Sequence, residues 1–169
     1  PHGLRLKLYR LIGPVQEGPT ILFGHANGIA SGSYIRLLEE LSLKATVFTF
    51  DARGHGGSSA PVTELDRLYQ LENFAMDLEA VAQAVHDEIG GAPFYYAAHS
   101  LNAIASLRLG AMRKRVPWKD MTLFEPSLFP PKTHPLRPLA EERTKRLVAL
   151  ARNRKARWPN PETFAEAQK

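Results

Sequence analysis

The sequence predicts an α/β fold in which a mostly parallel sheet is covered by helices on both faces. Short apolar runs at residues 20–23, 46–50 and 121–124 have the length and composition of strands. Amphipathic segments separate them, and Gly and Pro pairs mark the turns. Strands of about five residues alternating with helices of ten or more require a parallel sheet, because only parallel neighbours need such long crossovers.

Each element follows from its own pattern. Residues 4–11 alternate apolar and polar side chains, which indicates a strand that ends before Gly13-Pro14. The elements that follow are a strand at 20–23, a helix carrying Tyr34, Leu37, Leu38 and Leu41, a strand at 46–50, a Gly-, Ser- and Pro-rich loop at 52–71, a helix with the stripe Phe74, Leu78, Val81 and Val85, a strand at 93–98, a helix from about 101 to 113, and a strand at 121–124.

Prolines change the pattern from Pro126 onward, because no central strand accommodates so many of them. We therefore predict a core domain at residues 1–131 and the start of a helical cap at 132–169. The cap carries polar helices at 139–157 and 161–168, whose few apolar anchors are Leu139, Leu147, Leu150 and Phe164. Since the first residue is Pro1 and the last predicted helix is cut short, we expect the sequence to be part of a longer chain.

The composition is that of a globular protein. Of 169 residues, 44% are hydrophobic and 23% charged, and there is no Cys, which excludes disordered and disulfide-rich classes. No apolar run approaches the roughly 20 residues of a membrane span, and the first residues lack a secretory pattern. We expect a soluble cytoplasmic protein.

The net charge of +5 lies entirely in the predicted cap. The first 131 residues carry 12 Lys and Arg against 13 Asp and Glu, whereas residues 132–169 carry 10 against 4. Such a basic segment can bind nucleic acid or anionic lipid. The aromatic side chains that a single-strand binder interleaves with its basic residues are missing, so we favour a solvated helix face and expect no nucleic-acid partner.

The first motif that could support catalysis is Ala98-His99-Ser100-Leu101-Asn102, between a predicted strand and a predicted helix. In a strand-turn-helix elbow a serine is held on a strained turn at the carboxyl edge of the sheet. Small residues two positions before and after it keep the backbone clear, and here Asn102 is not small. The alternative is that Ser100 caps the following helix.

A second motif, Gly24-His25-Ala26-Asn27-Gly28-Ile29, follows the strand at 20–23 and therefore reaches the same edge, where open parallel sheets bind ligands. Acyl transfer needs N–H donors aimed at a developing oxyanion. We expect one donor from Leu101 and the other from this turn, from Ile29 or from Asn27 or Ala26. An ordinary βα turn is the alternative. We expect His25, Asn27, Gly28, His99 and Asn102 to border the substrate.

A third motif, Asp51-Ala52-Arg53-Gly54-His55-Gly56-Gly57-Ser58-Ser59, follows the strand at 46–50. It is no phosphate cradle, because no Lys follows and no helix starts at Ser58. We expect a tight loop in which Asp51 and Arg53 pair with each other or with loop amides. The sequence also lacks Cys and the His-Glu-x-x-His spacing of zinc sites, so we expect no metal.

These three motifs, in this order, resemble the α/β-hydrolase superfamily over residues 4–131. Gly28-Ile29 is similar to its His-Gly-x oxyanion turn, with Asn27 where His is usual, residues 53–58 to its Arg-Gly-His-Gly-x-Ser loop, and residues 98–102 to its Gly-x-Ser-x-Gly elbow. The chain also resembles a bacterial subgroup with a His-Ala-Asn-Gly turn and a Leu-Phe-Pro segment, here residues 25–28 and 128–130.

The resemblance implies a serine hydrolase that acts on an ester or related acyl substrate through an acyl-enzyme at Ser100, without a cofactor. Its base, a His after the last strand, has no counterpart here, so we expect this chain alone to be inactive. Glu125 is a candidate acid, the alternative being a strand-end carboxylate bonded to amides.

The rival hypothesis is a non-catalytic binding protein of the same fold, which Asn102 and Ala98 motivate. A strained positive φ at Ser100 favours the enzyme, and a relaxed helix cap favours the binding protein.

Overall fold

The computed structural model describes residues 3–14, 18–152 and 159–166. It divides into two compact units, Pro1–Ser127 and Leu128–Lys169, where the sequence predicted a boundary after residue 131. The α/β prediction is confirmed in the first unit, which contains the sheet.

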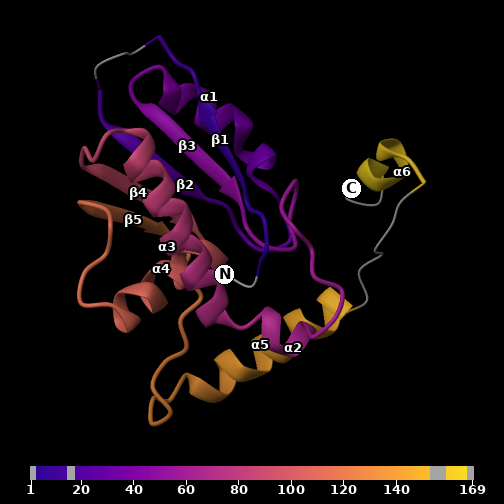
Figure 1. The fold of residues 1–169 in the computed structure, drawn as a ribbon. Helices are drawn as coiled ribbons and strands as arrows, with labels where there is room; N and C mark the ends of the chain where they lie inside the picture. The colour runs from indigo at the N-terminus through magenta and orange to yellow at the C-terminus, as the bar shows by residue number, and fades with distance from the viewer. Residues whose placement is uncertain (1–2, 15–17, 153–158, 167–169) are drawn as a thin grey trace. The chain divides into compact units, whose positions relative to one another are not determined.

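Five strands form one sheet in the order β1-β3-β2-β4-β5 (Figure 1). Their bounds are β1 (Lys7–Leu11), β2 (Thr20–Gly24), β3 (Thr46–Asp51), β4 (Phe94–His99) and β5 (Asp120–Phe124). Strand β1 is antiparallel to β3, and all other pairs are parallel. The carboxyl ends of β2, β3, β4 and β5 therefore meet at one edge of the sheet.

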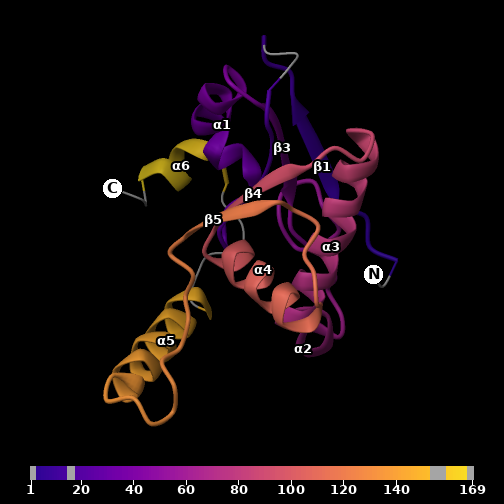
Figure 2. The ribbon, with the colours of Figure 1, turned by 90° about the vertical axis from the view of Figure 1, so that its left-hand side faces the viewer.

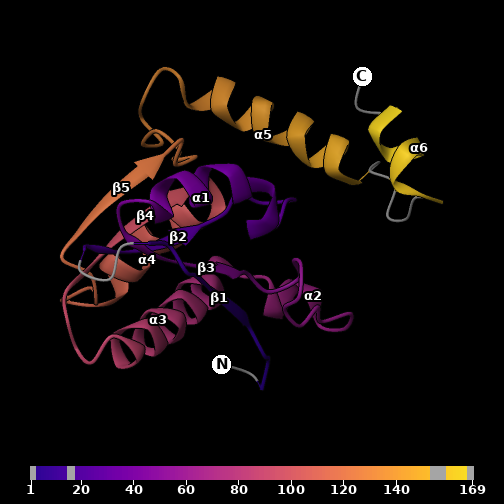
Figure 3. The same cartoon turned by 90° about the horizontal axis from the view of Figure 1, so that it is seen from above.

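Helices cover both faces of this sheet. Helix α1 (Ile35–Ser42), preceded by the short helix η1 (Ser31–Tyr34), lies on one face, and α3 (Leu71–Glu88) and α4 (Leu101–Met112) lie on the other (Figures 2 and 3). Alternate strand residues divide between two cores, as the period of two requires. Phe23 packs with Leu38 of α1, whereas Leu22 belongs to the core that α3 and α4 cover.

The predicted helix stripe of α3 is confirmed, because Phe74, Leu78, Val81 and Val85 are all buried. The predicted loop at 52–71 additionally contains a single helical turn, α2 (Leu65–Leu68). Sequence patterns miss it because four residues are too few to show a helical period.

The second unit contains α5 (Arg137–Arg152) and α6 (Pro161–Glu166). The predicted anchors Leu139, Leu147 and Leu150 are more than half exposed within it, and the side chain of Phe164 and residues 153–157 lie outside the described part. Ion pairs four residues apart join Arg137 to Glu141 and Glu142 to Arg146. No helix in the described ranges is both long and apolar enough to cross a bilayer.

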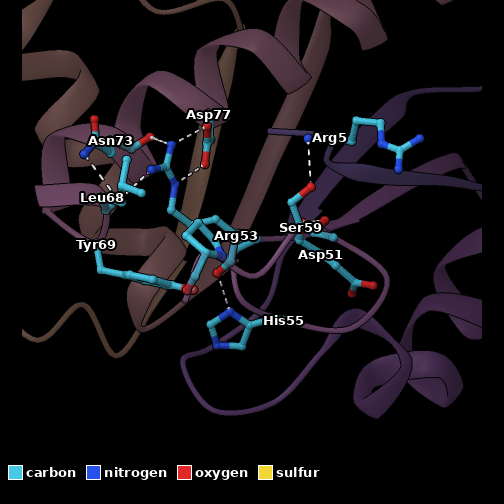
Figure 4. A network of polar contacts seen from close by, with 12 residues as sticks. Arg5, Asp51, Arg53, His55, Ser59, Leu68, Tyr69, Asn73 and Asp77 are labelled. Atoms are coloured by element: carbon cyan, nitrogen blue, oxygen red, sulfur yellow. Dashed lines mark hydrogen bonds and ion pairs between the residues drawn. The ribbon is translucent and has the colours of Figure 1, made fainter. Parts of the chain in front are cut away.

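One buried ion pair attaches the loop after β3 to α3. Arg53 is fully buried, and its guanidinium donates to Asp77 through Nε at 2.6 Å and Nη2 at 2.8 Å (Figure 4). Its remaining donors reach the carbonyl oxygens of Leu68 at 2.5 Å and Asn73 at 3.3 Å. Of the two alternatives expected for Arg53, pairing with Asp51 does not occur, since a carboxylate from α3 satisfies the guanidinium instead.

Removing one partner of this pair is expected to destabilise the protein strongly. Asp77→Asn should lower the free energy of unfolding by about 3–5 kcal/mol, because it leaves a buried guanidinium uncompensated. Urea unfolding followed by circular dichroism measures the loss. Arg113→Ala, which breaks the exposed pair with Glu79, is the matched control and should leave the unfolding midpoint unchanged. Equal midpoints for the Asp77 variant and the wild type would contradict this assignment.

Candidate active site

Ser100 occupies a strained turn between β4 and α4. Its backbone has φ 51° and ψ −104°, a conformation that non-glycine residues rarely adopt. Its N–H donates to the carbonyl oxygen of Phe124 at 2.9 Å, and its side chain makes no helix-capping hydrogen bond. The capping alternative therefore does not describe Ser100, and its hydroxyl is not used by the helix.

A second strained residue lies beside it. Among the described non-glycine residues, positive φ occurs at Glu64, Ser100 and Glu125, with 46° at Glu125. His99 pairs with Phe124 at the ends of β4 and β5. Ser100 and Glu125 are therefore the residues that directly follow these two neighbouring strands. Each such backbone costs about 1–3 kcal/mol and persists where surrounding structure enforces it, commonly at functional sites.

The turn after β2 is held by the buried ring of His25. Its Nδ1 lies 2.7 Å from the carbonyl oxygen of Ala26, and its Nε2 accepts the N–H of Ala52 at 2.9 Å. Nδ1 therefore carries the proton. With both nitrogens bound to backbone, the ring joins the turn after β2 to the loop after β3 and offers nothing to a ligand, so its placement does not support the expected substrate contact.

The turn contains four backbone amides, those of residues 26–29, and two of them already donate hydrogen bonds within the protein. The N–H of Ala26 donates to the hydroxyl of Tyr34 at 3.2 Å, and that of Gly28 donates to Nε2 of His55 at 3.0 Å. Of the expected donors, Asn27 and Ile29 remain in this turn. On the other side, Leu101 begins α4, and the first amides of a helix have no partner within it. The turn and α4 thus both bring N–H groups to the edge where Ser100 lies.

Asn102 does not contact the expected substrate position either. It is 1% exposed, and its Nδ2 donates to the carbonyl oxygen of His25 at 2.6 Å. Gly24 makes room for it, because a Cβ at Gly24 would lie 2.6 Å from the Cβ of Asn102. The large residue in the elbow is therefore accommodated by a small one at the end of β2.

His99 and Glu125 border an apolar cavity beside the elbow. The cavity has a volume of about 360 Å³ and is lined by Phe23, Tyr34, Leu37, His99, Phe124 and Glu125. Nδ1 of His99 lies 2.7 Å from the Tyr34 hydroxyl, and its Nε2 lies 3.5 Å from a Glu125 carboxylate oxygen. Ser100 is not among the lining residues, although His99, which directly precedes it, is.

The loop after β3 is folded around the Asp51 carboxylate. Asp51 accepts hydrogen bonds from both the N–H and hydroxyl of Ser31, from the Tyr9 hydroxyl and from the N–H of Gly57. Burial alone would raise the pKa of Asp51, but these bonds outweigh it and lower the pKa below 3.8. The expected bonding of Asp51 to loop amides is confirmed at Gly57.

Gly56 is required by the same contact. Its φ is 48°, and a Cβ there would approach the Asp51 carboxylate to 2.1 Å. In the rest of the loop, His55 Nδ1 lies 2.9 Å from the Arg53 carbonyl oxygen, and the Ser59 hydroxyl accepts the N–H of Arg5 (Figure 4). Among the described residues no group of His, Asp and Glu is arranged to hold a metal ion.

Two residues of the site, Tyr34 and Gly24, were given no role in it by the sequence, although Gly24 begins the second motif. Tyr34 was expected only as part of a helix stripe, and its partners Ala26 and His99 lie 8 and 65 residues away. A glycine ending a buried strand is itself a sign of close backbone approach, so Gly24 had a detectable signal. What approaches it, Asn102, is not predictable from local sequence.

The fold is that of the α/β hydrolases. The model of the alpha/beta hydrolase fold family matches residues 19–116, more than half of the chain, so the chain belongs to that family. Among curated proteins no sequence matches significantly.

Solved structures share the fold at low sequence identity. The chain is similar to an α/β hydrolase fold protein from Burkholderia ambifaria, with TM-score 0.60 and 23% identity over 85% of this chain and 49% of that one. It is also similar to a thioesterase domain from the curacin biosynthetic pathway, with TM-score 0.69 and 21% identity over 98% and 57%. An epoxide hydrolase from Vigna radiata gives TM-score 0.63 and 23% identity over 83% and 44%. The chain spans about half the length of the structures it matches.

The buried His25 is expected to make stability depend on pH. Burial lowers the pKa of His25 below its ordinary 6.5, so at and below that pH the unfolded chain binds a proton that the folded one does not. The free energy of unfolding should therefore fall as pH drops from about 7.5 to 5, by at most about 1.4 kcal/mol per pH unit. Asp51, with its lowered pKa, adds a separate loss only below about 3.8.

Urea unfolding at a series of pH values measures this slope. His25→Asn, which removes the titrating ring, should flatten it between pH 5 and 7.5. An unchanged slope in a folded His25→Asn variant would assign the pH dependence to other groups.

Proposed function

We propose that this chain provides the nucleophile and oxyanion-binding parts of a serine hydrolase that acts on a small carboxylic ester or related acyl compound. The observation that carries the proposal is the strained, uncapped Ser100 in a strand-turn-helix elbow. A serine that only terminated a strand or capped a helix would have no reason to adopt φ 51°. The amides of Leu101, and of Asn27 or Ile29, supply donors for the oxyanion.

In the proposed reaction the Ser100 Oγ attacks the acyl carbon while a base takes its proton. The tetrahedral oxyanion collapses, the C–O bond to the leaving group breaks, and the leaving oxygen receives the proton. Water then attacks the acyl-enzyme, releases the acid and restores the Ser100 hydroxyl. No step requires a cofactor.

We propose that the base is supplied from outside the described residues, as the resemblance to the family implies. His25 and His55 have both ring nitrogens bonded, and His99 lies between Tyr34 and Glu125. On the family resemblance we propose that the base is a His that these 169 residues do not supply, and we expect them alone to show no ester turnover.

Glu125 is our candidate for the acid that orients this base. It follows β5 as Ser100 follows β4, and its backbone is strained. Its side chain is 89% exposed, with Nε2 of His99 3.5 Å from one carboxylate oxygen. A carboxylate held beside the nucleophile and open to an approaching imidazole has the geometry that such an acid needs.

Labelling with a fluorophosphonate tests the nucleophile without a guess about substrate, because the probe reacts with an activated serine. In the complete gene product, mass spectrometry should locate the label on Ser100. Ser100→Ala should abolish labelling, and the exposed Ser33→Ala is the matched control that should retain it. A folded protein without label at Ser100 would contradict the proposal.

Glu125→Gln tests the acid. It should lower kcat about 10²–10⁴-fold, since a neutral amide no longer holds the base in its productive tautomer. The unfolding midpoint should stay unchanged because the side chain is exposed. Ester hydrolysis within twofold of the wild type would exclude Glu125 as the acid.

The second candidate is a non-catalytic binding protein of the same fold. The apolar 360 Å³ cavity beside the elbow, which Ser100 does not line, favours it. This candidate predicts a folded, unlabelled protein in the fluorophosphonate experiment, so the same measurement separates the two functions.

A further inference from the structure

The side chain of Asn102 connects the two segments that supply the proposed oxyanion donors, the amino end of α4 and the turn after β2. It lies in the first turn of α4, directly after Leu101. Its Nδ2 donates to the carbonyl oxygen of His25 at 2.6 Å, 77 residues away in sequence. At 1% exposure this hydrogen bond is shielded from water, which strengthens it and makes its loss costly.

This hydrogen bond matters because its acceptor, the carbonyl oxygen of His25, lies at the start of the turn. The carbonyl of His25 immediately precedes Ala26 and Asn27. Fixing this carbonyl therefore also fixes the positions of the backbone amides that follow it in the turn. The donor side chain belongs to the residue next to Leu101. One hydrogen bond thus sets the spacing between a donor amide on α4 and the donor amides of the turn.

The surroundings of Asn102 are shaped to hold it in this orientation. A Cβ at Gly24 would lie 2.6 Å from its Cβ and 3.1 Å from its Cγ, which keeps position 24 restricted to glycine. Tyr96 donates from its hydroxyl to the backbone oxygen of Asn102 at 3.3 Å. Gly24 pairs with Ala98 across β2 and β4, so this packing lies directly behind the elbow.

The turn has independent supports that would keep it folded without Asn102. The ring of His25 joins it to Ala52, and the Tyr34 hydroxyl joins Ala26 to His99. Removing the Asn102 carboxamide should therefore shift the turn relative to α4 without unfolding it.

We infer that Asn102 is a positioning residue, which holds the turn at residues 25–29 in register with the amino end of α4 so that both oxyanion donors meet one oxygen atom. This inference rests on the proposed function. It assigns a role to the residue where this elbow departs most from the small residue expected there. A filler of the core would need only the volume of Asn102, whereas a positioning residue needs its N–H donor.

The test compares Asn102→Gly and Asn102→Leu with the wild type in the complete gene product. Glycine removes the side chain, and leucine keeps about its volume without the donor. Both should lower kcat for an ester and the rate of fluorophosphonate labelling about 10–10²-fold, with KM changed less than threefold, because the donors act on the transition state. Labelling rates and kcat within twofold of the wild type in either folded variant would overturn the inference.

Ser106→Ala is the matched control. Ser106 is also buried on α4, but its hydroxyl donates to the carbonyl oxygen of Ala103 at 2.8 Å, within the same helix. It should lower the unfolding midpoint while leaving the labelling rate unchanged. A rate loss in Ser106→Ala equal to that of the Asn102 variants would assign their effect to general loosening of α4 and overturn the inference.

A second measurement uses Gly24 and depends on stability alone. In a Tyr96→Phe background, which removes the hydroxyl that also crowds position 24, Gly24→Ala should lower the unfolding midpoint markedly. The same substitution should cost little once Asn102→Gly has removed the opposing side chain. Equal losses in both backgrounds would contradict the packing on which the inference depends.

The outcomes separate this inference from the proposed function. Wild-type protein that is not labelled at Ser100 overturns the proposed function and the positioning role together. Labelled wild type with undiminished rates in the Asn102 variants overturns the positioning role alone.

Discussion

Four neighbouring strands of the sheet run in the same direction, and the site depends on this constraint. Parallel pairing of β3, β2, β4 and β5 brings their carboxyl ends to one edge, where the chain must leave the sheet through turns. The turn after β2, the loop after β3, the elbow after β4 and Glu125 after β5 all begin there. Segments more than a hundred residues apart thereby become neighbours.

At this edge, many backbone N–H and C=O groups lie beyond the hydrogen bonds that join neighbouring strands. Buried polar side chains bond to several of these groups instead. His25 bonds two backbone groups, Asn102 a third, and Asp51 accepts two backbone N–H groups. Unsatisfied buried groups cost about 1–3 kcal/mol each. These side chains therefore stabilise the fold and, because they are rigidly held, also fix the positions of the N–H groups that remain available.

Much of this was predictable from local sequence. The strands from residue 20 to 124 were expected within one residue at either end, and the α3 stripe is buried as its spacing indicated. Ser100 was placed between a strand and a helix, where it lies. Local patterns succeed here because burial imposes the periods of two and 3.6 on the sequence directly. The sequence predicted that the side chains of His25 and Asn102 border the substrate. In the structure both side chains are buried and bond to backbone groups instead.

Alternation, turn residues and the elbow motif determined the fold class, the order of elements and the position of Ser100, since each depends on residues close together in the chain. Only the tertiary structure decided the partners: Arg53 with Asp77, Asp51 with Ser31, and Asn102 with the backbone of His25. It also decided that a glycine at residue 24 permits an asparagine at residue 102. Burial makes a polar side chain take a partner, but which partner depends on the sheet order, and no local pattern carries that information.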